Sequence, residues 1–232
     1  MLHMHDLPQR SSIDLDGLFE SLHDSITNGR PLLKTDELVQ LLEDRADLDN
    51  YFDFGNSDQE GKTIFRPEKP QRPLVRISGR LAENTRLFNR YRMTLAHEYA
   101  HVVLHTPLYV RLFDRLTSTG AADDEWNAAT ELIPEVETQM EREVRHAAAA
   151  LLIPANSVHR ELRRQLGNRD CRSFINTRDG DLLCEWACKT FKVSIEAASI
   201  RLKQLGHLVE GPRRSTRGLT SIADILKTHG SN

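Results

Sequence analysis

The chain of 232 residues is predicted to have an α+β fold that is mostly helical. Apolar residues recur at helical spacing in long stretches such as residues 13–26 and 134–152. Two short runs typical of strands, residues 62–66 and 74–78, lie close together in the sequence and are joined by a proline-rich connection. These observations predict a helical core with one small β-sheet packed against it.

The N-terminal elements follow from local breaks in this pattern. Residues 1–30 are an N-terminal extension, in which a helix over 13–26 ends at the Asn-Gly-Arg-Pro break of residues 28–31. Thr35 is a candidate cap for a second helix whose leucines face inward. Residues 46–61 are acidic and are predicted to be a loop.

The longest predicted helices lie in the middle of the chain. One covers residues 86–105 and is expected to end near Pro107, because proline lacks the backbone N–H that a helix interior needs. Residues 107–133 have a mixed composition and are a candidate gating segment. The next helix covers residues 134–152, with a proline in its first turn and Pro154 beyond its end.

The C-terminal third is predicted to be helical and is basic. Helices over residues 182–191 and 195–205 are separated by a tight turn, and Gly206 ends the second helix. Residues 160–232 contain 14 Lys and Arg against 8 Asp and Glu, whereas residues 1–159 contain 17 against 26. A basic third suits an acidic partner or the DNA backbone, and it is equally typical of an ordinary arginine-rich helical surface.

The composition of the whole chain indicates a soluble protein. Its formal net charge is −3, and 39% of its residues are hydrophobic, which is enough to build a core. The three cysteines form no even disulfide framework, and no apolar stretch is long enough for a signal sequence or a membrane span. We therefore expect a cytoplasmic protein with no membrane partner.

One motif carries most of the chemical information. Residues 97–101 are His-Glu-Tyr-Ala-His and lie inside an apolar helical stretch. Residues four apart lie on the same face of a helix, so His97 and His101 can bind one zinc ion, with Glu98 beside them as a base for an attacking water. Such a site performs metal-assisted hydrolysis. The alternative is a pair of hydrogen-bonded histidines in the core.

A catalytic zinc site needs a third protein ligand and one open position for water. The candidates are Glu137, Glu141 and Glu143 on the next helix, and His105 on the motif helix. Glu141 and Glu143 point about 200° apart on a helix, so both cannot face one ion. His105 is expected to be a polar residue at a helix end rather than a ligand.

Two longer stretches place the motif in context. Residues 89–105 are Asn-Arg-Tyr-Arg-Met-Thr-Leu-Ala-His-Glu-Tyr-Ala-His-Val-Val-Leu-His, and residues 141–154 are Glu-Arg-Glu-Val-Arg-His-Ala-Ala-Ala-Ala-Leu-Leu-Ile-Pro. Together with the strand at residues 73–78, they resemble the ImmA/IrrE family of zinc metallopeptidases. The resemblance implies a zincin-like core with one catalytic Zn²⁺, and it places the ligands at His97, His101 and Glu141.

The chain departs from the family pattern close to the expected third ligand. Arg145 stands where the family has an asparagine. Because it lies four residues after Glu141, it is a candidate ion-pair partner of that carboxylate and would compete with a metal ion.

The resemblance also implies a domain organisation. Residues 182–206 resemble the helix-turn-helix-like segment that often follows the peptidase core in this family. The expected parts are an N-terminal extension (1–30), a zincin-like metallopeptidase domain (31–158), a helical helix-turn-helix-like subdomain (159–210) and a flexible basic tail (211–232).

The same family implies a biological role. It suggests a zinc endopeptidase that cleaves a small helix-turn-helix repressor or antitoxin, in stress response, mobile-element control or toxin–antitoxin control. Direct contact with DNA is the less favoured alternative, and its candidate residues are Glu196, Arg201, Lys203 and Gln204.

The expected mechanism assigns roles to other parts of the chain. Glu98 acts first as general base and then as proton donor to the leaving nitrogen. An extended peptide is expected to add to an exposed edge of the strand at residues 74–78. The candidate oxyanion donors are Tyr91, Tyr99, Tyr109, His105 and His146.

Two hypotheses from other functional classes compete with this one. The first is a non-catalytic zinc-containing regulator that binds a repressor partner or DNA, with all four metal positions filled by protein. The second is a metal-dependent hydrolase that acts on a different substrate. Replacement of Glu98 by Gln separates the catalytic hypotheses from the regulator, because only catalysis requires the base.

Overall fold

The computed structural model describes residues 14–55, 57–120, 134–167 and 172–210. These residues form mainly helices together with two small sheets, so the predicted α+β, mostly helical class is confirmed. Within these ranges, no helix combines the length and the apolar character that a membrane span requires.

The chain forms two compact units. Unit 1 contains residues up to 17 and residues 35–148, and unit 2 contains residues 18–34 and those from 149 onward. The domain boundaries near residues 30 and 158 stay predictions. The flexible basic tail was predicted for residues 211–232, which lie outside the described residues.

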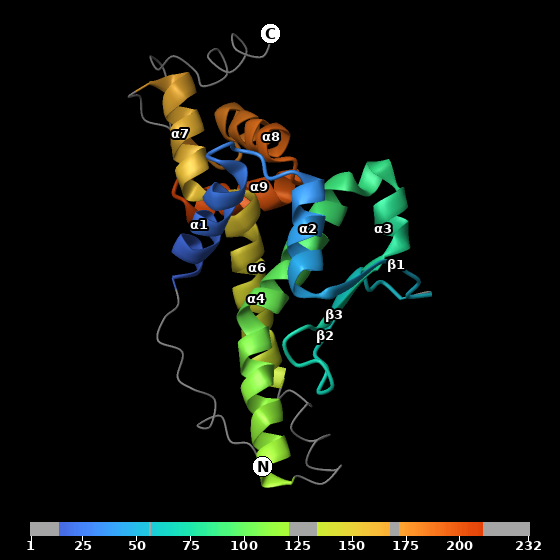
Figure 1. Cartoon of the computed structure of the whole chain (residues 1–232). Helices are drawn as coiled ribbons and strands as arrows, with labels where there is room; N and C mark the ends of the chain where they lie inside the picture. Colours follow the sequence, from blue (N-terminus) through green and yellow to red (C-terminus); the bar gives the residue numbers. More distant parts are fainter. Residues whose placement is uncertain (1–13, 56, 121–133, 168–171, 211–232) are drawn as a thin grey trace. The chain divides into compact units, whose positions relative to one another are not determined.

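Unit 1 combines a three-stranded sheet with a long helix (Figure 1). The strand order is β1 (Asp47–Phe52), β3 (Leu74–Ser78), β2 (Gly61–Ile64), with β1 parallel and β2 antiparallel to β3. The long helix is α4 (Phe88–Thr119), and α2 (Thr35–Arg45) packs against it through buried leucines.

Short helices connect the sheet to α4, and a second long helix lies beside α4. α3 (Gly79–Glu83) and the 3-10 helix η2 (Thr85–Leu87) lead from the last strand into α4. α6 (Pro134–Leu152) has the bounds predicted from its flanking prolines. The part of α6 that belongs to unit 1 runs alongside α4 (Figure 1).

The predicted role of residues 74–78 as an exposed sheet edge is wrong. β3 is the middle strand, paired on both sides, and its Val75 and Ile77 are fully buried. Among the described residues, the edges belong to β1 and β2. The error arose because β1 lies in residues 46–61, which were predicted to be a loop. Its Asp- and Asn-rich sequence has low strand propensity, but pairing with β3 satisfies its backbone.

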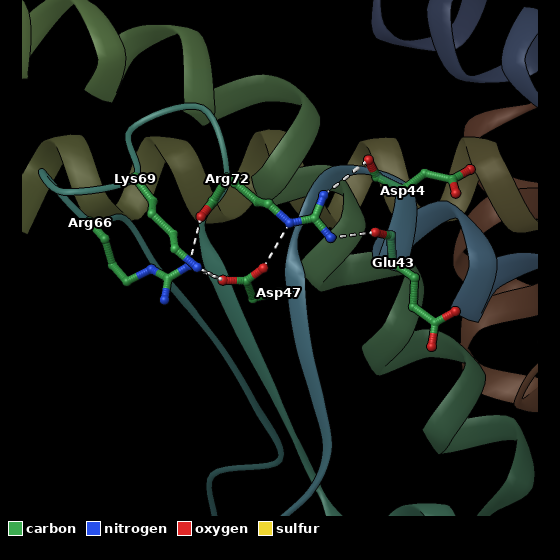
Figure 2. A network of polar contacts seen from close by, with 6 residues as sticks. All are labelled: Glu43, Asp44, Asp47, Arg66, Lys69 and Arg72. Atoms are coloured by element: carbon green, nitrogen blue, oxygen red, sulfur yellow. Dashed lines mark hydrogen bonds and ion pairs between the residues drawn. The ribbon is translucent and has the colours of Figure 1, made fainter.

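A cluster of charges stabilises the start of β1. The Asp47 carboxylate accepts hydrogen bonds from Arg66, Lys69 and Arg72, and Arg72 also donates to the backbone carbonyls of Glu43 and Asp44 (Figure 2). These cations lie in the connection between β2 and β3, so the cluster ties that connection to the end of α2. The three donors hold the pKa of Asp47 well below its usual value of 3.8.

We expect Asp47→Asn to lower the melting temperature by a few degrees at pH 7. A carboxyl whose pKa is lowered by folding stabilises the protein above its ordinary pKa, and this stabilisation is lost as the pH falls below that value. The difference between wild type and variant should therefore shrink in acid and in high salt. Thermal unfolding between pH 7 and pH 2 tests this, and a difference that persists in acid would contradict it.

Helix α4 does not end near Pro107, as predicted, but continues through it to Thr119. Phe113 and Leu116, which follow the proline, are buried. Their packing outweighs the loss of one backbone hydrogen bond at Pro107. The helix ends instead at Gly120, which adopts the left-handed conformation and donates its N–H to preceding carbonyls. The rest of the candidate gating segment, residues 121–133, lies outside the described residues.

Unit 2 is a group of helices with one short parallel strand pair. The pair is β4 (Ser173–Phe174) with β5 (Leu208–Val209). Two of its helices are joined by a three-residue turn, in which Lys192 takes the left-handed conformation and Ser194 caps the second helix. Unit 2 contains residues 18–27 of α1 (Leu15–Thr27), together with α7 (Ala155–Leu166), α8 (Arg178–Phe191) and α9 (Ile195–Gln204).

One residue of α9 is not available for the DNA contact considered above. Arg201 is 0% exposed, donates from Nε to the carbonyl of Ile153 and lies 3.5 Å from the Glu20 carboxylate. Glu20 in turn accepts the backbone N–H of Ala155. Arg201 therefore holds parts of unit 2 together, and its inclusion among the DNA-reading candidates is wrong.

Candidate metal centre

The two motif histidines lie on one face of α4, one helical turn apart. Their Nε2 atoms are 3.2 Å from each other. Helix α6 supplies a carboxylate to the same point: Glu141 Oε1 lies 3.1 Å from His101 Nε2, and Glu141 Oε2 lies 3.4 Å from His97 Nε2. Two helices from distant parts of the sequence thus bring three ligand atoms together.

The spacing of these atoms fits a metal ion. In a tetrahedral zinc site with bonds of about 2.0–2.1 Å, neighbouring ligand atoms are about 3.3–3.4 Å apart. The three observed separations, between 3.1 and 3.4 Å, are close to this value. Two imidazoles and one carboxylate are also the ligand set of a catalytic zinc site, which leaves its fourth position open. The residues His97, His101 and Glu141 are therefore compatible with a metal site.

Among the candidate glutamates, the structure places only Glu141 with the histidines. Hydrogen bonds with His101 and His97 hold the pKa of Glu141 well below its usual range. Glu143 instead accepts a hydrogen bond from Gln139 on its own helix, and Glu137 is exposed. Arg145 Nη2 lies 4.0 Å from Glu141 Oε2, so the expected i, i+4 ion pair is present at long range.

Glu98 lies beside His97, His101 and Glu141 and is almost completely buried, with 4% of its surface exposed. Its Oε2 accepts a hydrogen bond of 2.7 Å from Thr63 Oγ1 on β2. Burial raises the pKa of Glu98, and the Thr63 hydrogen bond and the nearby His97 oppose this shift. A carboxylate held in this way is suited to take up a proton.

Strand β2 approaches Glu98 so closely that a side chain at its first residue would displace its neighbours. A Cβ atom on Gly61 would lie 2.5 Å from Glu98 Oε1 and 2.7 Å from Thr94 Cγ2. Sequence reasoning found the strand but not these roles of Gly61 and Thr63, because nothing local in the sequence reports that β2 packs on α4. The feature of the sequence that could have indicated this close packing is a glycine two residues before a threonine in a short strand.

His105 is fully buried and lies one turn beyond His101 on α4. The Nδ1 atoms of the two rings are 3.0 Å apart. His105 is therefore in contact with His101, on the opposite side of the His101 ring from His97 and Glu141. From the sequence we expect His105 to be a polar residue at a helix end and a candidate oxyanion donor, whereas the helix in fact continues past it.

The remaining oxyanion candidates lie in different surroundings. Tyr99 is fully buried and has no access to a substrate, and the Tyr91 hydroxyl is hydrogen-bonded to Asn50. His146 Nε2 lies 3.2 Å from the Asp16 carboxylate. Tyr109 stacks on Phe65, with ring centroids 4.0 Å apart, and so continues the contact between α4 and the segment that follows β2.

The model of the peptidase family described as the IrrE N-terminal-like domain matches residues 48–203. The chain belongs to this family. The match confirms the family resemblance found in the sequence, and it includes the HExxH motif on α4 and Glu141 on α6. Membership in the IrrE N-terminal-like family indicates a metallopeptidase. No curated protein and no solved structure matches the chain.

Proposed function

We propose that this protein is a zinc-dependent endopeptidase in which His97, His101 and Glu141 hold the metal ion and Glu98 is the general base. The observation that carries the proposal is the convergence of three ligand atoms beside one buried carboxylate. A zinc ion bound there would supply Lewis acidity, which acidifies water and polarises the scissile carbonyl.

The residues of the chain then perform the proton transfers. The Glu98 carboxylate removes a proton from the attacking water and later delivers it to the leaving nitrogen. Its raised pKa favours proton uptake, and the Thr63 hydrogen bond keeps one carboxylate oxygen in place. The other oxygen faces Gly61, so β2 fixes the position of the base from one side.

The strand that lies against the base also offers a way to hold a peptide. β2 is an edge strand among the described residues, and its Thr63 contacts Glu98. An extended peptide that adds to β2 through backbone hydrogen bonds would lie next to the metal position. This replaces the expectation that the peptide adds to β3, which is paired on both sides.

Gly61→Ala is expected to lower peptidase turnover about 10- to 100-fold, while metal binding is kept. The added Cβ atom displaces the Glu98 carboxylate, and a displaced base contributes much less to the rate. Lys62→Ala, at an exposed position on the same strand, is the matched control. Turnover and metal content are measured for both variants. Wild-type turnover in Gly61→Ala would show that the base does not depend on β2.

As substrate we propose a small helix-turn-helix repressor or antitoxin, on the strength of the family. The test is incubation of the protein with such a repressor encoded beside it, with and without a chelator, followed by mass spectrometry. A single cut that requires the metal supports the proposal. An intact repressor, with cleavage of a proteome-derived peptide library under the same conditions, would refute this substrate but not the peptidase.

A further inference from the structure

The contact between His101 and His105 constrains where their protons lie. The two Nδ1 atoms are 3.0 Å apart, and the planes of the two rings are inclined to each other by 61°. A contact of this length between two imidazole nitrogens is a hydrogen bond only if one nitrogen carries a proton and the other presents a lone pair.

The metal position decides which ring donates. His101 Nε2 faces His97 Nε2 and Glu141 Oε1, so its lone pair is the one directed at a metal ion. A neutral imidazole that uses the Nε2 lone pair carries its proton on Nδ1. With a metal ion bound at His101 Nε2, His101 Nδ1–H therefore donates to His105 Nδ1, and the proton of His105 is on its Nε2.

We propose that His105 is a positioning residue that fixes the tautomer and the ring orientation of the ligand His101. Metal-binding histidines usually donate their second ring N–H to an acceptor, and this acceptor is most often a carboxylate, a backbone carbonyl or water. Here a neutral imidazole takes that place. His105 is 0% exposed, so packing fixes the acceptor in position. The proposal rests on the metal site of the proposed function, but not on the reaction catalysed there.

The repeated spacing of the three histidines makes this arrangement a property of one helix. His97, His101 and His105 follow one another at intervals of four residues on α4. The first interval brings the two ligand nitrogens together, and the second brings the acceptor to the far side of the His101 ring. The helix backbone therefore orients both contacts without a loop.

Two substitutions in the full chain separate this role from a packing role. His105→Leu fills a similar volume and removes the acceptor, whereas His105→Asn places its Oδ1 near the position of Nδ1. Affinity for Zn²⁺ is measured by competition with a chromophoric chelator, starting from the metal-free protein. We expect about a 10- to 100-fold loss in His105→Leu. We expect most of the affinity to return in His105→Asn, with the metal-free melting temperature of His105→Leu unchanged or higher.

A third measurement uses the unchanged protein and therefore does not depend on whether a variant folds. Long-range ¹H–¹⁵N spectra of the zinc-loaded protein should show His101 protonated at Nδ1 and His105 protonated at Nε2. A proton on His105 Nδ1 would overturn the proposal, as would wild-type zinc affinity in His105→Leu. A wild-type protein that binds no zinc would refute the metal site itself. Absence of cleavage would refute only the proposed reaction.

Discussion

Replacing Glu98 with Gln should reduce peptidase turnover about 10²- to 10⁴-fold, the usual contribution of a general base. The amide has the shape of the carboxylate, and its oxygen can accept the Thr63 hydrogen bond. It cannot take up the proton of the attacking water. Because Glu98 is buried and its pKa is raised, loss of its charge should not destabilise the fold.

This result is checked with a proteome-derived peptide library, by counting new peptide ends with and without a chelator. Metal content and melting temperature are measured on the same samples, and both should match the wild type. Unchanged cleavage would exclude Glu98 as the base. A wild-type protein that binds zinc tightly but cleaves no peptide would favour the non-catalytic regulator.

Removal of the Glu141 carboxylate should weaken zinc binding by more than about 100-fold. Loss of a residue that only orients a ligand costs about 10- to 100-fold in metal affinity, and loss of a ligand should cost more. Glu141 is the residue through which α6 reaches both histidines. The variant Glu141→Ala should therefore lose both its metal and its activity.

Glu143→Ala is the matched control for this experiment. It removes a carboxylate from the same helix, two residues away, where the side chain contacts Gln139 rather than the histidines. Zinc affinity is measured in the same chelator competition for both variants. Comparable losses in Glu141→Ala and Glu143→Ala would contradict the assignment of the third ligand.

The sequence determined those parts of the fold and site that depend on local spacing. The spacing of the HExxH motif places two imidazoles on one face of the helix, whatever that helix packs against. The bounds of α6 follow from a proline in its first turn and another beyond its end, and the register of Glu141 follows from the same segment. The strand at Leu74–Ser78 could be predicted for a similar reason, because the alternation of apolar and polar residues along it is a local pattern.

Only the tertiary structure decided which segments meet. Residues 47–52 become a strand because β3 is there to pair with them, and β3 thereby becomes the middle of the sheet rather than an edge. Packing of Phe113 and Leu116 keeps α4 helical beyond Pro107. Contacts between distant residues also bring Gly61 and Thr63 to Glu98 and bury Arg201. Local spacing fixes the direction of a side chain on its own helix or strand, whereas long-range packing selects its neighbours, and no short window of sequence contains that information.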